Sequence, residues 1–289
     1  MPDIGRIGIW AGDLDSYPMA AVREAVAVIE DGGYGTLWFP ETTGREAMAQ
    51  AGILLSATRR IVVAAGTADI YARDAVTTAA AQRTLDEAFP GRFLLGLWES
   101  HPSLAEDVRG HDFGVPVATM RRYLEAMDAA PFGPPRLSGV PRRLLVALDT
   151  EMVKLAGELA WGANPLGMPV EHTKNARAVL GPGALLAVTQ LVILDQGRSN
   201  SADLARSYAA ALLPNRSALL HDLGFEEVDS LDERLVNALI VRGSADDIAH
   251  RVEEHIEAGA DHVSLYVLTA TPGTPPTRQW HELAGHLLA

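Results

Sequence analysis

The 289 residues of this chain exceed an average domain but fit one α/β barrel, and an apolar content of 48% indicates a large core. The net charge of −13, with no basic stripe anywhere in the sequence, argues against a nucleic-acid partner. Because the chain contains no cysteine, disulfides, thiolate metal sites and a cysteine nucleophile are excluded.

Stretches with strand character recur eight times along the chain, and a helical pattern follows each of them. In chain order they are 6–10, 36–39, 60–66, 92–98, 142–149, a weaker run at 161–167, 189–196 and 262–268. Helix boundaries lie between them. Asp74 precedes an alanine-rich pattern that ends at Pro90, and Ser244 precedes apolar residues at four-residue intervals.

Strands that alternate with helices pair in parallel and carry their helices on the outside. Eight such units predict a (β/α)₈ TIM barrel made by a single domain, 1–289, in preference to an open doubly wound sheet. The longest gap, 197–260, contains helical patterns but no strand. We therefore expect a helical insertion before the last strand.

A barrel of this kind places its functional site at the C-terminal ends of the strands. The exit of the third strand, 66–73, carries Thr67, Asp69, Tyr71 and Arg73, where a plain connection needs only a turn and a cap. Further strand exits that we expect at the same end are 39–43, 98–103 and 164–169. These loops are the first candidates for a site.

Several other classes of site are excluded by missing motifs. No helix carries a metal-binding pattern, since His250 and His255 are five residues apart and point to different faces, so we expect no metal. The chain has no G-x-S-x-G elbow, no Walker loop and no G-x-G-x-x-G after the first strand. Its two lysines, Lys154 and Lys174, fall on helices, which argues against a Schiff-base aldolase.

The location of the protein is predicted from what the sequence lacks. The N-terminal residues show no basic region followed by an apolar core, so no signal peptide is expected. No apolar run reaches the ~18 residues needed to span a membrane. We expect a cytoplasmic protein without a membrane partner.

The segment GTADIYARD at 66–74 resembles the third-strand exit of the bacterial-luciferase-like family, especially the branch that depends on the deazaflavin coenzyme F420. Other stretches that are similar to the family, in the correct order, are 33–46, 89–101, 142–163, 169–173 and 258–268. The match spans nearly the whole chain. It implies the same barrel, a helical insertion before the last strand, and a homodimer.

The resemblance also implies where the cofactor binds. It places a bulge with a non-proline cis peptide at Gly66–Thr67, behind the ring of the cofactor, and phosphate contacts in the loop 164–169. The implied cofactor-binding residues are Gly66, Thr67, Ala68, Asp69, Trp98, Ser100, Asn164, Gly167 and Met168. Interpreted without the family, the third-strand exit is an ordinary turn in which Tyr71 is packed and Arg73 pairs with Asp74.

Two residues are candidates for catalysis. Glu41 follows the second strand, where relatives have an ionisable residue beside the reactive edge of the ring, and His101 follows the fourth strand, where relatives carry His or Glu. Each also has a structural interpretation. Glu41 is equally compatible with a carboxylate at a helix N-terminus, and His101 with a cap of the next helix.

The sequence departs from the family pattern at two positions. Trp98 stands where relatives usually have glycine, and Asn164 stands where they often have histidine. An indole at position 98 either fills the ring pocket or provides a wall for stacking. Arg45 and Arg73 are the local candidates to meet the acidic tail of F420.

Three functions follow from the resemblance. The leading one is an oxidoreductase that transfers a hydride between F420 and a small organic substrate. The second keeps the reaction class but uses FMN, which would make the protein a luciferase-like monooxygenase. The third is a degenerate, non-catalytic family member that binds a ligand without turnover.

Overall fold

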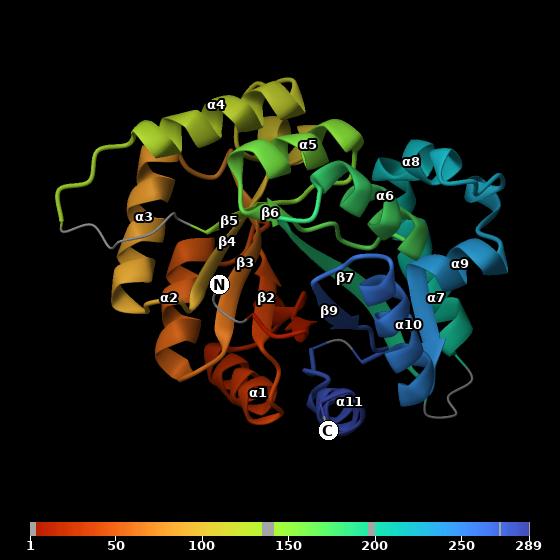
Figure 1. Cartoon of the computed structure of the whole chain (residues 1–289). Coiled ribbons are helices and arrows are strands. Elements are labelled where there is room, and N and C mark those ends of the chain that lie inside the picture. The colour runs from red at the N-terminus through yellow and green to blue at the C-terminus, as the bar shows by residue number, and fades with distance from the viewer. Residues whose placement is uncertain (1–3, 135–141, 196–199, 272, 289) are drawn as a thin grey trace.

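Parallel strands at the centre of the molecule form one sheet in the computed structural model, which describes residues 4–134, 142–195, 200–271 and 273–288 (Figure 1). The strands are β1 (Ile7–Trp10), β2 (Thr36–Pro40), β3 (Val62–Asp69), β4 (Phe93–Trp98), β5 (Arg143–Leu145), β6 (Gly162–Ala163), β7 (Leu185–Leu194), β8 (Ile240–Gly243) and β9 (His262–Val267). Each of the eight predicted stretches overlaps one of these strands. Their bounds differ most at β5 and β6, which are shorter than predicted, and at β7, which begins earlier.

The sheet closes on itself. β1 pairs with β2 and β9, and β6 pairs with β7, so that β1–β7 and β9 form a barrel of eight strands. The predicted TIM barrel is confirmed. The expectation that 197–260 contains no strand is wrong, because β8 lies there. It pairs with the C-terminal end of β7, outside the barrel. Its four residues are too few to show a strand period in the sequence.

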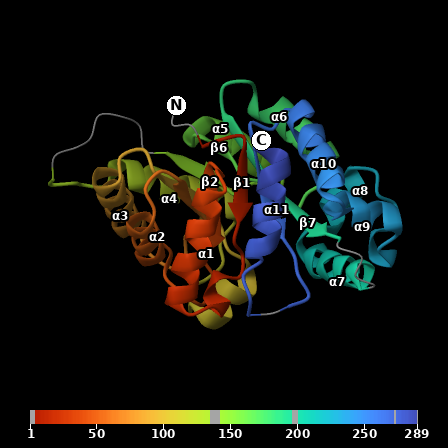
Figure 2. The same ribbon diagram turned by 90° about the horizontal axis from the view of Figure 1, so that it is seen from below.

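Helices surround the barrel and also build the insertion. Around the barrel lie α1 (Met19–Asp31), α2 (Ala47–Ala57), α3 (Ala75–Ala88), α4 (Pro116–Ala129), α5 (Thr150–Leu159), α6 (Val170–Leu180), α10 (Ala245–Glu257) and α11 (Thr277–Leu287). The insertion contributes α7 (Ser201–Leu212), α8 (Ser217–Asp222) and α9 (Glu233–Leu239), which group on one side of the barrel (Figure 1). α11 packs beside α1, as Figure 2 shows from below.

The predicted helix caps are present. The carboxylate of Asp74 accepts a hydrogen bond from the backbone N–H of Thr77 at 2.9 Å. Ser244 and Asp247 form a reciprocal capping box at the start of α10. These caps satisfy backbone donors that have no partner inside a helix, so the local sequence fixes where α3 and α10 begin.

Large side chains fill the lumen of the barrel. Trp10 and Trp38 stack with ring centroids 6.3 Å apart and belong to a buried cluster inside the strands. The indole N–H of Trp38 donates to Nε2 of His262 at 3.0 Å, so the other ring nitrogen of His262 carries the hydrogen that faces the carbonyl of Gly5 at 2.7 Å. Side chains therefore fill the lumen below the strand exits, so that a ligand site is confined to the mouth of the barrel, at the C-terminal ends of the strands.

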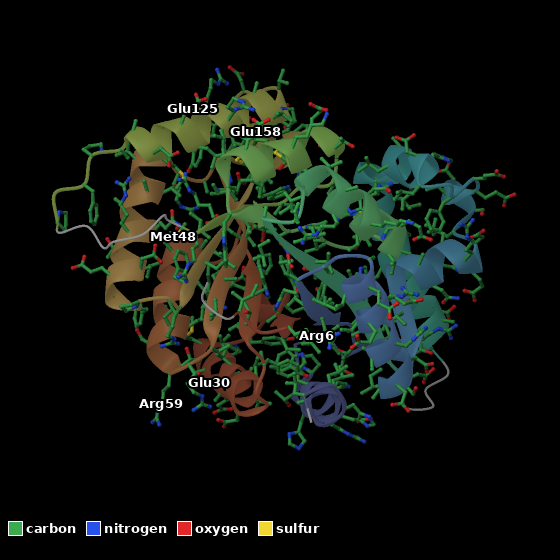
Figure 3. All side chains as sticks on the ribbon, in the orientation of Figure 1. Arg6, Glu30, Met48, Arg59, Glu125 and Glu158 are labelled. Carbon is green, nitrogen blue, oxygen red and sulfur yellow. The ribbon has the colours of Figure 1, made fainter. Side chains whose placement is uncertain are left out.

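At the opposite end of the barrel, polar contacts to the backbone hold the segment that leads into β3. The carboxylate of Glu30 accepts hydrogen bonds from the backbone N–H groups of Arg59, Arg60 and Ile61, where the chain enters β3. Glu30 and Arg59 lie close together near α1 and α2 (Figure 3).

Among the helices of the described ranges, none is both long enough and apolar enough to cross a membrane.

Candidate functional site

The exit of β3 is bulged. Its pairing with β4 skips between Ala65 and Ala68, and its pairing with β2 shifts at Pro40. The predicted bulge is confirmed, but the predicted cis peptide at Gly66–Thr67 is wrong, because this bond is trans. The physical reason is that the bulge already absorbs the extra residue of β3, so the backbone changes direction without a cis bond.

Two glycines make the bulge possible. A Cβ atom on Gly66 would lie 2.5 Å from the indole ring of Trp10, and a Cβ atom on Gly96 of β4 would lie 2.8 Å from the carbonyl oxygen of Gly66. Real Cβ atoms do not approach other atoms so closely. The bulge therefore rests against Gly96 on one side and against Trp10 on the other.

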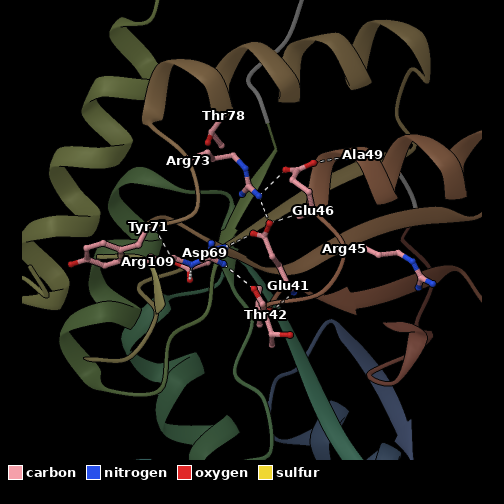
Figure 4. A network of polar contacts seen from close by, with 12 residues as sticks. Glu41, Thr42, Arg45, Glu46, Ala49, Asp69, Tyr71, Arg73, Thr78 and Arg109 are labelled. Carbon is pink, nitrogen blue, oxygen red and sulfur yellow. Dashed lines mark hydrogen bonds and ion pairs between the residues drawn. The ribbon is translucent and has the colours of Figure 1, made fainter. Parts of the chain in front are cut away.

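Glu41 lies at the centre of a buried polar network (Figure 4). Its side chain is 3% exposed, and its oxygens accept hydrogen bonds from the backbone N–H groups of Ala47 at 3.1 Å and Asp69 at 2.9 Å. Arg73 forms an ion pair with Glu41 and another with Glu46 at 2.7 Å. Burial opposes the positive charge and is the largest single effect, but the hydrogen bond to Glu41 and the charges of Glu41 and Glu46 together outweigh it and raise the pKa of Arg73. Ala47 begins α2, so Glu41 matches its structural interpretation as a carboxylate at a helix N-terminus.

Asp69, at the end of β3, connects the segments that follow β2, β3 and β4. Its fully buried carboxylate accepts hydrogen bonds from the Tyr71 backbone N–H at 2.8 Å, from the Ser100 hydroxyl at 3.0 Å and from Nε of Arg109 at 3.0 Å. Arg109 also donates to the carbonyl of Thr42 at 2.8 Å. The sequence did not reveal Arg109, because a single arginine in a loop gives no sign of its long-range partner.

Glu99 is a second residue that sequence reasoning missed. In the described part of the chain its buried Oε2 atom has no hydrogen-bond partner. Burial raises the pKa of Glu99 to about 7, and the charges of Asp149 and Asp69 act in the same direction. The signal was present in the sequence, since Glu99 directly follows β4. Because β4 ends at Trp98, however, strand alternation gives no direction for the side chain of Glu99, and the sequence alone did not single it out.

Trp98 and His101 form a pair at the exit of β4. Trp98 alternates with Leu94 and Gly96, so it stands on the lumen side, and its ring meets that of His101 edge to face with centroids 5.5 Å apart. The indole is partly exposed and is not a member of the buried lumen cluster. Nδ1 of His101 accepts from the backbone N–H of Leu104 at 3.3 Å, which is the capping role considered from the sequence.

The loop after β6 holds the remaining predicted residues. Asn164 is fully buried and donates to the carbonyl of Ala187 at 2.6 Å, which links β6 to β7. Gly167 has a positive φ of 63°, and its N–H donates to the carbonyl of Thr189 at 3.0 Å. The N–H of Gly167 is therefore not available to a ligand. The neighbouring Met168 is buried just before the N-terminus of α6.

Arg216, a residue of the insertion, contacts this loop. Arg216 donates to the carbonyl of Leu166 at 2.9 Å, and its buried Nε has no partner among the described residues. Burial lowers the pKa of Arg216 to about 10. Among the described residues Arg216 has no carboxylate partner, and such a cation next to the loop 164–169 suits an anion. Arg216 is a third residue that sequence reasoning missed.

The predicted residues thus form three groups. Glu41 is hydrogen-bonded to Thr67 and Asp69, and Asp69 in turn to Ser100. Trp98 packs on His101, and the loop after β6 is hydrogen-bonded to β7. Arg45 points away from the network (Figure 4) and binds the carbonyls of Leu14 and Tyr17, both at 2.6 Å. Within the described ranges, no cluster of three or more His, Asp or Glu side chains is arranged to hold a metal ion.

A family model described as luciferase-like monooxygenase matches residues 7–262. A protein of Mycobacterium tuberculosis that carries the provisional name coenzyme F420-dependent oxidoreductase is 31% identical over 120 residues. The matched segment covers 42% of this chain and 35% of that relative.

Solved structures share the fold at low sequence identity. An F420-dependent secondary alcohol dehydrogenase, solved with an F420–acetone adduct, matches with a TM-score of 0.79 at 15% identity and covers 98% of this chain and 97% of its own. The coenzyme F420-dependent tetrahydromethanopterin reductase of Methanopyrus kandleri has a TM-score of 0.72 at 17% identity, with 97% of each chain covered. The monooxygenase RslO1 of Streptomyces bottropensis has a TM-score of 0.72 at 16% identity and covers 98% and 99%.

Proposed function

Because this chain belongs to the luciferase-like monooxygenase family, we propose that it is an oxidoreductase that uses coenzyme F420 and acts on a small organic substrate. The relative from M. tuberculosis supports F420 as the cofactor. The observation that carries the proposal is the buried Oε2 atom of Glu99, which has no partner among the described residues; Glu99 directly follows Trp98, the residue paired with Asp69 at the end of β3. When bound, F420 supplies the hydride chemistry, and the protein supplies binding, orientation and proton handling.

The residues present at the mouth fit such a cofactor. The bulge at Gly66, Thr67 and Ala68 would back the ring, as the family resemblance implies. Arg216 would provide the positive charge for the phosphate beside the loop after β6, with the N-terminus of α6 behind it. Gly167 is not a donor in this proposal, because its N–H already bonds to Thr189.

Glu99 is the group to which we assign proton transfer. A carboxyl group with a pKa of about 7 is present in both protonation states near neutral pH, which suits a general acid or base. Glu41 is less suited to this role, since both of its oxygens are already engaged by backbone N–H groups and Arg73. We therefore assign Glu41 to positioning of the β2 and β3 exits, and retain His101 as a neighbour of the ring through its contact with Trp98.

The test is a fluorescence titration of the purified protein with F420 and with FMN, side by side. Saturable binding of F420 that exceeds that of FMN is expected. The Glu99→Gln variant should bind F420 as the unchanged protein does, because Glu99 handles a proton and does not hold the ring. Saturable binding of FMN alone would replace F420 by FMN and favour a monooxygenase, and binding of neither would leave a non-catalytic family member.

The homodimer that the resemblance implies stays a prediction. Its measurement is the molar mass in solution, which light scattering coupled to size-exclusion chromatography gives directly.

A further inference from the structure

The two residues that flank Glu99 are both bonded to the exit of β3. The carbonyl of Trp98, the residue before Glu99, accepts a hydrogen bond from the backbone N–H of Ile70 at 3.1 Å. Ser100, the residue after it, donates its hydroxyl to the carboxylate of Asp69 at 3.0 Å. The backbone of Glu99 is therefore held on both sides by the same neighbouring segment.

Ser100 has an unusual backbone conformation. Its φ of 69° lies in the left-handed region, and in the described part of the chain Leu231 is the one other residue besides glycines with a positive φ. This conformation is unfavourable for a residue with a Cβ atom, so it persists where surrounding contacts enforce it. The hydrogen bond to Asp69 is such a contact, and it is made by a side chain that is buried.

Asp69 offers Ser100 a fixed acceptor. Its carboxylate is fully buried, and it also accepts hydrogen bonds from the backbone N–H of Tyr71 at 2.8 Å and from Nε of Arg109 at 3.0 Å. These contacts prevent the carboxylate from following a movement of Ser100. The position of the Ser100 hydroxyl is therefore set by β3 and not by its own loop.

We propose that Ser100 is a positioning residue whose hydroxyl, bonded to Asp69, locks the turn that keeps the carboxyl group of Glu99 in its buried place. This role rests on the proposed function, in which Glu99 transfers a proton. A proton donor has to be held at a fixed position relative to the reacting atom, whereas a glutamate in an unrestrained loop turns towards water. Ser100 thus acts through Glu99 and not on the reacting atoms themselves.

The surroundings of Glu99 make its position measurable. Burial is the largest cause of its raised pKa, the carboxylates of Asp149 at the cap of α5 and of Asp69 add to the increase, and the backbone N–H of Glu99 acts in the opposite direction. All of these effects depend on the present place of the carboxyl group. If the side chain turned to solvent, its pKa would return towards the ordinary value of 4.5.

The test follows the carboxyl carbon of Glu99 by ¹³C NMR during a pH titration without F420, and Glu99→Gln assigns the signal. Ser100→Ala loses the hydroxyl and keeps the cost of a positive φ, so the pKa of Glu99 should fall from about 7 by at least about one unit. Ser100→Gly loses the hydroxyl but adopts a positive φ freely, so the fall should be smaller. Ser103→Ala is the control and should leave the pKa unchanged, because the exposed Ser103 bonds to His101 and not to Asp69.

A second measurement separates positioning from a purely structural hydrogen bond. The unchanged protein loses stability between pH 5 and pH 8, because the pKa of Glu99 is higher in the fold than in the unfolded chain, and Ser100→Ala should lose less. In urea unfolding, the destabilisation caused by Ser100→Ala should therefore be larger at pH 5 than at pH 8. The same substitution made in Glu99→Gln should cost equally at both pH values.

A pKa of Glu99 that stays near 7 in both Ser100 variants overturns the proposal, and so does an equal fall in Ser103→Ala. A destabilisation by Ser100→Ala that is the same at pH 5 and pH 8 overturns it as well. If Ser100→Ala does not fold, the NMR titration of Ser100→Gly decides alone, since glycine carries no strain at this φ. Because no measurement contains F420, a failed F420 titration would refute the proposed function without changing these results.

Discussion

Arg73 offers a direct comparison of a buried and an exposed partner. Glu41→Gln removes a buried charge that also accepts two backbone hydrogen bonds, so we expect a loss of roughly 3 kcal/mol in the free energy of unfolding. Glu46→Gln removes the half-exposed partner and weakens the cap of α2, for which we expect about 1 kcal/mol. Urea unfolding measures both. Equal losses in the two variants would show that the burial of Glu41 carries no special weight.

Glu99 should make the fold less stable as the pH rises. Its pKa of about 7 lies above the ordinary value of 4.5, so the folded protein retains a proton that the unfolded chain releases between these values. The stability contributed by that proton is complete below pH 4.5 and is lost as the pH approaches 7. Between pH 5 and pH 8, Glu99→Gln should gain roughly 2–3 kcal/mol relative to the unchanged protein.

Urea unfolding at the two pH values checks this expectation. The exposed Glu125 on α4 supplies the control variant, Glu125→Gln, which should show no such gain. An identical pH dependence for Glu99→Gln and the unchanged protein would mean that the carboxyl group is ionised in the fold, and would remove it as an acid.

At the scale of elements, the β3 bulge depends on two close approaches of different kinds. Gly96→Ala places a methyl group against backbone atoms of the bulge, which cannot move aside, whereas Gly66→Ala places one against the ring of Trp10. Each substitution should cost roughly 1–3 kcal/mol through overpacking. Trp10→Leu should reduce the cost of Gly66→Ala and leave that of Gly96→Ala unchanged. Double-mutant cycles from urea unfolding measure these couplings, and a rescue of both glycine variants would contradict the packing described.

The sequence predicted most of these elements because their signals are local. Buried β-branched runs such as 60–66 mark strands, and Asp74 and Ser244 mark helix starts. The bulge was predicted through the family resemblance, but its trans bond at Gly66 depends on packing against other strands, which no local pattern contains.

The candidate site was less accessible to prediction for the same reason. Glu41 was singled out from the sequence as a candidate for catalysis, but its contacts with Arg73 and two backbone N–H groups bring together segments far apart in the chain. The partners of Arg109 and the isolation of Glu99 likewise arise only when three strand exits meet. β8 was missed because its pairing partner is the C-terminal part of β7, Leu191–Leu194, which lies far from it in the sequence.

At the scale of the whole molecule, two buried histidines connect distant parts. His255 on α10 bonds to Thr173 on α6 and Gln190 on β7, both at 2.8 Å, and His262 lies in the lumen. Burial lowers the pKa of His255 to about 3 and that of His262 to about 4. Between about pH 6.5 and pH 4, both histidines therefore remain neutral in the folded protein, whereas the same histidines in the unfolded chain take up protons.

The protein should therefore lose stability as the pH falls from about 6.5 towards 4, by up to roughly 1.4 kcal/mol per pH unit for each histidine. His255→Gln keeps hydrogen-bonding capacity but cannot titrate, so its stability should fall less steeply. His250→Gln, at an exposed position on α10, should follow the unchanged protein. Unfolding by urea at several pH values measures the slopes, and parallel curves for all three proteins would contradict the prediction.

The pairing of β8 with β7 has an evolutionary consequence. Leu194, the last residue of β7, stands opposite Gly243, the last residue of β8, so the chain returns to the point from which it left the barrel. The helices of this excursion share their own apolar cluster, which includes Ala209, Leu220 and Leu239. A segment whose ends are neighbours can be lengthened, shortened or exchanged while the eight-stranded ring stays closed. Descendants of this chain can thus inherit the barrel unchanged and vary the wall beside its mouth.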